Sequence, residues 1–585
     1  MTSTTARPNP TAPATEIAEH ERELIDSAIE TLTAGSRTWS SLMVAQRVTL
    51  LRAVRAAVAE AAEEWAEVAA DSKGLRRGHP LRGEEWLSGP YAALGALDAY
   101  IDTLRKISDG RSALDGVRTA RAPGGRTRVA AFPLTGTDAF LMSGFSGEVW
   151  LEPGVTPATA RRDAGLGQLT PAESGGVGLV LGAGNITSIP VLDVLYELLA
   201  YNRVSLLKVN PTQDALVPVF ERALMPLIGA GLLRIVRGGA AVGTYLTAHP
   251  GLEHVHITGS AATFDAIVWG TDAQAKRRRR ENRPRLKKPI TAELGGVSPI
   301  IIVPGEWSAA DIAFQVAHVA TMRLQNAGHN CIAGQVVILS PEWPQREQFL
   351  AALRRAYALA PERPIWYPGS ANRMAQAAEA YPDALVLADR LLVEITAEDD
   401  ATALQSTEYF APVLGVVEVP GVGQDFFDAA VAYANDSLQG TLGANILIDP
   451  ATERWLGAGF ERTLADLRYG SIAVNTWTGV GFATPTMTWG AYPGNTISAV
   501  GSGIGIVHNA LLLASVEKSI MRGPFRPLPR SLPGANGGGR FTILPTPPWF
   551  TSARTGAQVS AGLTRYRAHG GIRTLARTLL AALRA

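Results

Sequence analysis

The only cysteine of the 585-residue chain, Cys331, lies in the segment LQNAGHNCIAGQVVIL. A thiol is the one side chain here that acts as a strong soft nucleophile without a metal or an elaborate triad. Asn and Gly residues crowd before it, a helical pattern precedes it and a strand-like pattern follows it, so we expect it at a turn, where catalytic groups concentrate. A cysteine taken at random is more often a small buried hydrophobe inside an apolar run. The surroundings of Cys331 therefore favour a nucleophile over a core residue.

Glu293 is a lone carboxylate in ITAELGGVSPIII, between an apolar segment and a Gly-Gly turn that leads into a very apolar strand. The glycines permit close approach of the backbone. A carboxylate at the edge of an apolar region tends to have a raised pKa, which suits a general base near neutral pH. The alternative is a solvated turn residue without a chemical role, and this pattern alone leaves both open.

Asn185 lies in LGAGNITSIP, where a strand runs into a Gly-rich turn and then into a helix that begins near Pro190. The turn matches the dinucleotide-binding fingerprint only loosely, as G-x-G-x-x-T, and this short pattern is often accidental. An Asn at such a turn either bonds the local backbone or directs an amide donor at a developing oxyanion. Asn185 is therefore a candidate of a second kind, a stabiliser of negative charge.

In their order along the chain, these segments resemble the aldehyde dehydrogenase superfamily. The resemblance covers roughly residues 185–509 and rests on six ordered motifs at family-like intervals, which together are far more specific than any one of them. They are the loop with Asn185, VSLLKVNP with Lys208, the ITGS turn with Gly259 and Ser260, ELGG with Glu293, the N-x-G-x-x-C box that ends at Cys331, and E-x-F-x-P with Glu408 and Phe410. The segments YGSIAVN and WGAYPG follow.

The resemblance implies a thiolate mechanism. Cys331 attacks the aldehyde carbon, and the oxyanion of the thiohemiacetal is held by the Asn185 amide and the Cys331 backbone N–H. A hydride is then transferred from the thiohemiacetal to the nicotinamide of the cofactor. Glu293 then deprotonates the water that hydrolyses the thioester, and a carboxylic acid is released.

The resemblance also implies a dinucleotide site. Lys208 and Glu408 hold the adenine-side and nicotinamide-side ribose hydroxyls. Phe410 packs near the nicotinamide, and Gly259 and Ser260 meet the pyrophosphate at a helix N-terminus.

The chain departs from the family pattern at several places. Ala183-Gly184 replaces the usual Pro-Trp, His329 replaces the Gln of the cysteine box, and Ala411 replaces the Gly of E-x-F-G-P. Phe264 stands where a second Gly normally permits close approach to the pyrophosphate, so this departure bears on the cofactor half of the resemblance rather than on the reacting atoms. NAD-preferring members often have an acid three residues after the lysine, but Pro211 is at that position here. The cofactor is therefore expected to be NAD or NADP.

Two alternatives to aldehyde oxidation remain open. One is a reductive or acyl-transferring relative that is linked to coenzyme A, but such relatives generally lack the base that Glu293 supplies. The other is a catalytically silent relative that binds a nucleotide or an anionic partner. The residues at Phe264 and His329 keep this second alternative open.

The elements that position these residues predict an α/β protein. After residue 175, strand-like and helix-like segments alternate, which specifies a parallel, Rossmann-type sheet with helices on both faces, and a second α/β pattern follows. We expect a disordered tail at residues 1–16, a cofactor domain at 17–290 with a candidate bridging β segment at 127–154, and a catalytic domain at 291–480. Residues 481–585 are expected to complete the core and to add a Pro/Gly-rich linker and a basic terminal helix.

The composition of the chain narrows the possible classes of protein further. Lys and Arg number 54 against 53 Asp and Glu, and 46% of residues are hydrophobic, which is typical of a soluble globular protein and gives no overall charge for nucleic acid. One cysteine excludes an intramolecular disulfide and a multi-cysteine metal site, so a reducing cytoplasm is expected. Two long uncharged runs are rich in Gly, Asn, Ser, Thr and Pro and predict buried strands and loops. The resemblance implies a small aldehyde substrate and a homo-oligomer, a dimer or tetramer.

The segment from Lys276 to Lys288 contains nine Lys or Arg and one Glu in thirteen positions. We interpret it as a solvated insertion, because so many charges cannot be packed. The rival interpretation is an anion-binding surface for a phosphate-bearing substrate, nucleic acid or acidic lipid. Peripheral contact with acidic lipid through this segment and the basic C-terminal helix is the version that the pairing of the two favours.

Overall fold

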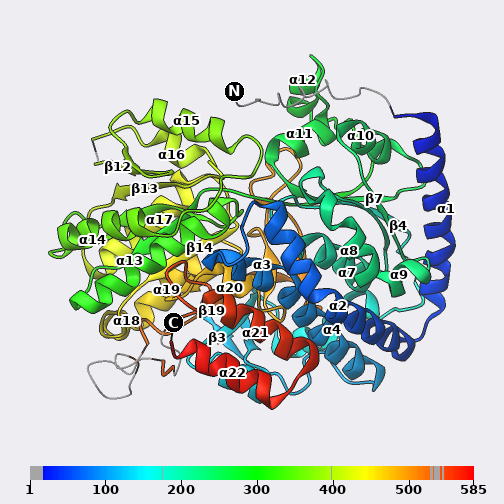
Figure 1. The fold of residues 1–585 in the computed structure, drawn as a ribbon, viewed down its shortest axis with the longest axis horizontal. Helices are drawn as coiled ribbons and strands as arrows, with labels where there is room; N and C mark the ends of the chain where they lie inside the picture. Colours follow the sequence, from blue (N-terminus) through cyan, green and yellow to red (C-terminus); the bar gives the residue numbers. More distant parts are fainter. Residues whose placement is uncertain are drawn as a thin grey trace, which may run out of the picture.

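The computed structural model describes residues 17–173, 175–396, 398–527, 531, 540–542 and 546–584. Two β-sheets lie side by side with helices packed over their faces (Figure 1), which confirms the predicted α/β class. The predicted tail at residues 1–16 and much of the Pro/Gly-rich linker lie outside the described residues. Among the described helices, none combines the length and the apolar character needed to cross a membrane.

The smaller sheet has six strands in the order β17-β8-β7-β4-β5-β6. All neighbours are parallel except β17, which runs antiparallel to β8. Its parallel strands are continuous apolar runs such as VGLVL, because helices cover both faces. The bounds are β4 Val177–Leu181, β5 Val204–Lys208, β6 Leu233–Val236, β7 His254–Gly259, β8 Ile290–Leu294 and β17 Gly503–Ile504.

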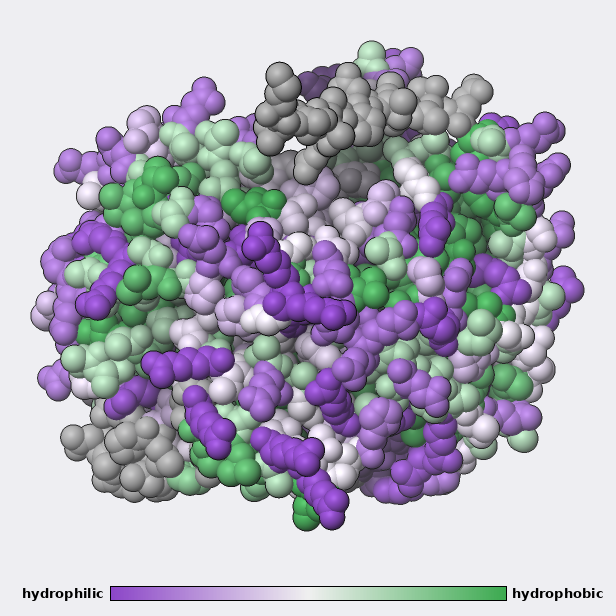
Figure 2. Space-filling model, viewed as in Figure 1, coloured by the Kyte–Doolittle hydropathy of each residue, from purple (hydrophilic) through white to green (hydrophobic). Residues whose placement is uncertain are grey.

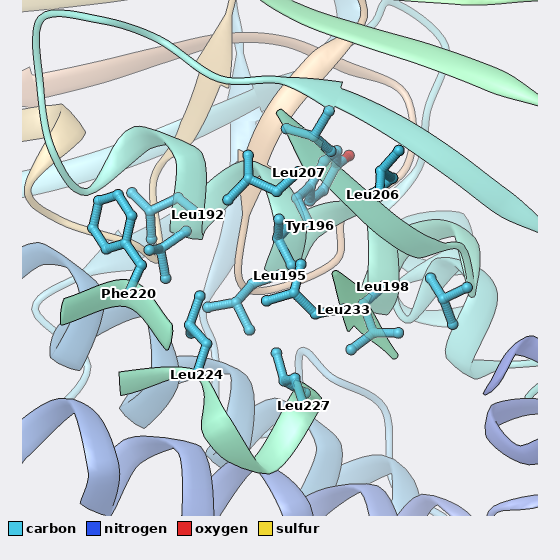
Figure 3. Packing of buried hydrophobic residues seen from close by; sticks show 14 of the residues in the cluster. Leu192, Leu195, Tyr196, Leu198, Leu206, Leu207, Phe220, Leu224, Leu227 and Leu233 are labelled. Atoms are coloured by element: carbon cyan, nitrogen blue, oxygen red, sulfur yellow. The ribbon is translucent and has the colours of Figure 1, made fainter. Parts of the chain in front are cut away.

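The core of this half forms around α7 (Ile189–Tyr201), which is buried along almost its whole length. Figure 3 shows Leu195 and Leu198 of α7 facing Leu206 of β5 and Leu227, with apolar side chains from several elements closing the space between them. The helices of this half are α1 Glu19–Ser41, α2 Val44–Ser72, α4 Ala92–Ser108, α8 Val217–Ala223, α9 Met225–Gly229, α10 Ala240–Ala248, α11 Ala261–Trp269 and α12 Ala275–Arg280.

The larger sheet has eleven strands in the order β1-β2-β3-β19-β15-β14-β9-β10-β13-β12-β11. Its strands from β19 to β12 are parallel, and the others are antiparallel to their neighbours. The bounds are β1 Thr119–Ala122, β2 Arg126–Phe132, β3 Ser146–Leu151, β9 Ser298–Ile302, β10 Gly334–Leu339, β11 Leu385–Leu387, β12 Arg390–Glu394, β13 Val413–Glu418, β14 Gly443–Leu447, β15 Ser471–Val474 and β19 Val516–Arg522. A separate pair is formed by β16 Thr488–Gly490 and β18 Ile506–Asn509.

The two sheets do not divide the chain where the sequence places the boundary. Strand β8 belongs to the six-stranded sheet, so the division falls between β8 and β9 rather than at residue 290, and Glu293 is on the cofactor-domain side. The candidate bridging segment, 127–154, contributes β2 and β3, which pair with each other and with β19 of the same chain. Hydrophobic periodicity identifies strands but does not state which sheet each one joins, and this explains the shifted boundary. The bridging role of residues 127–154 stays a prediction.

Helices cover the larger sheet, and the C-terminal extension returns to the N-terminal helices. These helices are α13 Ala309–Leu324, α14 Arg346–Leu359, α15 Ser370–Ala380, α16 Thr402–Ser406, α17 Gly423–Ser437, α18 Pro450–Leu456, α19 Ala458–Asp466 and α20 Thr478–Phe482. Short helices α3 Gly83–Trp86, α5 Gly136–Leu141 and α6 Pro157–Asp163 lie in the first third of the chain. The predicted terminal helix is α22 Ile572–Ala582, and α21 Gly556–His569 precedes it and packs on α2 and α3 (Figure 1).

The basic segment is not a loop but contains the short helix α12, whose Lys and Arg side chains are mostly exposed, as predicted for a solvated insertion. Arg278 and Arg279 pair with Asp272 at 2.9 Å and Asp265 at 2.8 Å. In Figure 1, α12 lies at one end of the view and α22 at the opposite end. The two basic segments therefore do not form one continuous surface. Figure 2 shows hydrophilic side chains spread over this face among smaller apolar areas.

Candidate active site

Cys331 lies in the turn between α13 and β10, as the sequence predicts. Helix α13 ends at Leu324, and the next residues Asn326, Ala327 and Gly328 all have a left-handed backbone, with φ of 53°, 54° and 76°. Few side chains tolerate this region, and Asn and Gly are the residues that do so most readily. The turn leaves Cys331 half-buried on the wall of a cavity of about 590 Å³.

Glu293 lies beside this thiol although it comes from the other sheet. Its side chain is 3% exposed, and the indole Nε1 of Trp489 donates a hydrogen bond to its Oε1 at 3.2 Å. Burial raises the pKa of Glu293 to about 7, which agrees with the sequence argument for a carboxyl at an apolar edge. Burial and the negative charge of Glu293 raise the pKa of Cys331 well above its ordinary value. Near neutral pH, therefore, Glu293 is partly ionised beside a protonated thiol.

Asn185 lines the same cavity as Cys331. Its Nδ2 donates to the backbone oxygen of His329 at 2.9 Å, and its own backbone oxygen accepts from Lys73 Nζ at 2.8 Å and from Asn326 Nδ2 at 3.2 Å. An amide nitrogen carries two hydrogens, so the bond to His329 leaves a second donor for an oxygen in the cavity. The structure therefore brings Asn185, Glu293 and Cys331 to one place from three separate segments.

A buried ionic network, absent from the sequence analysis, holds this arrangement in position. Lys73 Nζ lies 2.8 Å from Glu85 Oε2, and Arg363 bridges Glu84 at 2.5 Å and Glu85 at 2.9 Å. The backbone N–H of Asn326 donates to Glu84 Oε2 at 3.0 Å. The network thus connects α2 and α3 to the turn before the thiol. No local sequence pattern identifies these residues as partners, because Arg363 and Glu84 are 279 positions apart.

The residues assigned to the dinucleotide lie at the carboxyl edge of the six-stranded sheet. Lys208 ends β5 and Gly259 ends β7. Ser260 caps α11, and its hydroxyl accepts from the backbone N–H of Thr263 at 3.2 Å. Ligands of parallel α/β sheets bind at this edge, and the N-terminus of a helix attracts a phosphate group. The arrangement suits the pyrophosphate of a dinucleotide.

Glu408 lies close to Glu293, against the Gly-Gly turn. Its Oε1 is buried and has no hydrogen-bond partner among the described residues, so it can bond a ligand hydroxyl. A Cβ at Gly295 would meet this oxygen at 1.9 Å, which explains the need for glycine there. Burial, followed by the charge of Glu293, raises the pKa of Glu408 to about 8. An unpartnered buried acceptor beside the nucleophile fits the ribose of a nicotinamide nucleotide.

Phe410 and His329 belong to an aromatic cluster next to Cys331. The ring of His329 lies 5.8 Å from that of Phe410 and 5.5 Å from that of Trp366. His329 is fully buried, and burial lowers its pKa to about 2, so its imidazole stays neutral. This residue replaces an amide of the expected cysteine box with a large neutral ring, and it does not displace the thiol.

Comparison with known proteins shows which family the chain resembles. A model of the "Aldehyde dehydrogenase family" matches residues 203–361, a stretch that contains Lys208, Gly259, Glu293 and Cys331. Over this stretch, about a quarter of its length, the chain is similar to the aldehyde dehydrogenase family. N-Succinylglutamate 5-semialdehyde dehydrogenase of Chromobacterium violaceum is 28% identical over 252 residues, 40% of this chain and 47% of the relative. 4-Trimethylaminobutyraldehyde dehydrogenase of Homo sapiens is 32% identical over 127 residues, 22% of each chain. The first of these matches spans about half of the relative's length, and the second about a fifth.

Solved structures of aldehyde dehydrogenases share the fold of the chain. AldH of Staphylococcus aureus in a substrate-bound state has a TM-score of 0.56 at 16% identity, over 85% of this chain and 93% of that chain. An aldehyde dehydrogenase of Mycobacterium tuberculosis complexed with NAD+ has a TM-score of 0.56 at 19% identity, over 83% and 87%. The superfamily fold thus covers most of the chain.

Phe264 replaces the second glycine of the expected pyrophosphate turn. In the structure the ring of Phe264 is fully buried in the core of the six-stranded half, on the inner side of α11. The exposed end of this helix carries Gly259 and Ser260 instead. Sequence spacing identifies the position of Phe264 but not the face of the helix that its ring occupies.

Proposed function

We propose that the protein oxidises an aldehyde to a carboxylic acid with NAD or NADP as the hydride acceptor. The observation that carries this proposal is that Asn185 and Cys331 line one cavity while Glu293 lies beside the thiol. The match of residues 203–361 to the aldehyde dehydrogenase family model supports it, as do relatives whose names describe dehydrogenases of semialdehydes and aldehydes.

The first half of the reaction forms a bond between sulfur and carbon. Glu293, with a pKa of about 7, accepts the proton of the Cys331 thiol, and the thiolate attacks the carbonyl carbon of the aldehyde. Negative charge moves to the carbonyl oxygen. The second amide hydrogen of Asn185 and the backbone N–H of Cys331 donate to this oxygen.

The second half breaks a carbon–hydrogen bond and then the thioester. When bound, the oxidised nicotinamide supplies the acceptor for the hydride that leaves as the oxyanion re-forms its carbonyl. Glu293 must first release the proton taken from the thiol. It then deprotonates a water molecule that attacks the thioester carbon, and Cys331 leaves as a thiolate while the acid departs.

The dinucleotide would be held by residues at the edge of the six-stranded sheet and by two residues that precede β13 of the larger sheet. Gly259 and Ser260 would meet the pyrophosphate, while Lys208 and Glu408 would bond the two riboses and Phe410 would pack near the nicotinamide. The unpartnered Oε1 of Glu408 supports its assignment.

The choice between NAD and NADP depends on the surroundings of Lys208. Pro211 occupies the position where an acid usually supports NAD preference. Asp214 follows three residues later, its charge acts on Lys208, and its Oδ1 is buried without a hydrogen-bond partner among the described residues. A carboxylate here would accept from a ribose 2′-hydroxyl and repel a 2′-phosphate. Asp214 therefore favours NAD.

Absorbance of reduced nicotinamide tests the proposal. Purified protein is mixed with NAD or NADP and a panel of short, long-chain and aromatic aldehydes, with Cys331→Ser as the matched control. The expected result is turnover in the wild type that the variant loses. Turnover only with coenzyme A would favour the acyl-transferring alternative, and nucleotide binding without turnover would favour the silent one.

Three further properties stay predictions of the sequence. The superfamily resemblance implies a dimer or tetramer, and the basic segments predict peripheral contact with acidic lipid. The cytoplasmic location also stays a prediction.

A further inference from the structure

The cavity beside Cys331 is much larger than a reacting carbonyl group needs. Its volume is about 590 Å³, within the range of roughly 300–1,000 Å³ that is typical of sites for drug-sized ligands. A short aldehyde would fill only a small part of it. The chemistry of the walls therefore indicates which substrate occupies the remainder.

The walls close to the nucleophile are mostly aromatic and aliphatic. Ile332, Trp477, Val480, Phe482 and Trp489 line the part that the larger sheet and its connections supply. Trp489 is also the donor to Glu293. Burial of an apolar substrate against such a surface makes the binding free energy more favourable by about 0.8 kcal/mol for each methylene.

The charged side chains at the cavity are balanced by opposite charges within the chain. Arg55 pairs with Asp98 at 2.8 Å, and Asp102 pairs with Lys106 at 3.1 Å. Arg567 lies 4.4 Å from the centre of the Tyr91 ring, and the negative charges of Asp98 and Asp138 act on it. No single charge in this set is left to select an anionic or cationic substrate.

The C-terminal extension closes another part of the cavity. Helix α21 contributes Leu563 and Tyr566, and Pro548 and Trp549 precede it. The helix is firmly seated, since Arg55 donates to the backbone oxygen of Ala568 at 2.9 Å, and a Cβ at Gly83 would lie 2.7 Å from the Cα of Ala557. Figure 1 shows α21 beside α2 and α22. The extension is thus a fixed wall of the cavity.

We propose that this cavity is a substrate chamber for uncharged aldehydes with a large apolar body, of which α21 forms the outer wall. This inference rests on the proposed function, because it names the substrate class of the same site. It separates the protein from relatives that are named for aldehydes bearing charged groups, an N-succinylglutamate semialdehyde and a trimethylamino-substituted aldehyde. The length of the apolar body is limited by the space between Cys331 and α21.

The first test is a series of unbranched aldehydes from acetaldehyde to decanal, oxidised by the wild-type protein with NAD. We expect kcat/KM to rise about fourfold with each added methylene, the ratio that corresponds to 0.8 kcal/mol, until the chamber is filled. A flat or falling series would overturn the proposal. If no aldehyde of any length is oxidised, the proposed function fails, and calorimetric titration with 1-octanol and 1-propanol still tests the chamber. Tighter binding of octanol supports it, and equal binding of both alcohols overturns it.

The second test narrows the chamber by a substitution on α21 of the C-terminal extension. Leu563→Trp adds bulk to the wall, and Leu580→Trp makes the same change on α22 at a side chain that is 57% exposed and outside the cavity. We expect the ratio of kcat/KM for decanal to that for acetaldehyde to fall about tenfold in the first variant, the equivalent of almost two methylenes, and to stay unchanged in the control. An unchanged ratio in Leu563→Trp, or an equal fall in both variants, would contradict the assignment of α21.

Discussion

Glu293→Gln removes a base from the site while it preserves the shape of the side chain. The carboxyl is buried and accepts from Trp489 at 3.2 Å, and the amide oxygen of Gln keeps this hydrogen bond. Only proton acceptance is lost. General base catalysis typically contributes about 100- to 10,000-fold to a rate, so we expect steady turnover to fall by a factor in this range.

The same change favours the first half of the reaction. The negative charge of Glu293 is one of the causes that raise the pKa of Cys331. Removing the charge lowers the pKa of the thiol, so the thiolate forms more readily without the base. We therefore expect Glu293→Gln to form the thioester once and then stall, because hydrolysis is the step that still needs proton acceptance.

Rapid-mixing absorbance measures both effects. The variant should give a burst of reduced cofactor close to the concentration of active sites, followed by a slow phase, while Cys331→Ser gives no burst. In the wild type, turnover should fall below pH about 7, because a carboxyl with this pKa is charged in only about one tenth of the molecules one unit lower. The variant should lack this acid limb. Unchanged steady turnover in Glu293→Gln, or an acid limb that persists near pH 7, would refute the base role.

Two other substitutions test the groups around the thiol. Asn185→Ala removes the proposed oxyanion donor, and kcat is expected to fall about 100- to 1,000-fold; a change of less than threefold, measured in the same absorbance assay, would exclude Asn185 from this role. Arg363→Met leaves the buried Glu84 and Glu85 without their shared partner, and we expect the free energy of unfolding in urea to fall by about 3–5 kcal/mol. Arg354→Met breaks a more exposed ion pair and should lower the free energy of unfolding by no more than about 1 kcal/mol. Equal losses in both variants would contradict the stabilising role of the buried network.

The parts of the site with local sequence patterns could be predicted. Cys331, Glu293 and Asn185 each follow or precede a turn rich in Gly or Asn, next to an apolar strand or helix. In the structure Asn185 and Cys331 line one cavity, and Glu293 contacts the thiol. The alternation of strands and helices after residue 175 likewise predicts the parallel sheet. Such patterns depend on neighbours in the chain, which is why a single sequence reveals them.

The parts of the site that depend on contacts between distant segments of the chain could not be predicted from the sequence. Lys73 and Arg363 meet Glu85 only in the folded chain, and a buried charge far along the sequence carries no periodic pattern. The contribution of α21 to the cavity is of the same kind. Phe264 shows a third limit, because its position in the motif does not determine that its ring enters the core.

The most direct test of the account is intact-protein and peptide mass spectrometry of Glu293→Gln after reaction with decanal and NAD. The account predicts an added decanoyl group on the peptide that contains Cys331, formed only when the cofactor is present, since the thioester arises after hydride transfer. No added mass in a sample that has produced its burst of reduced cofactor, or an acyl group on a residue other than Cys331, would contradict it.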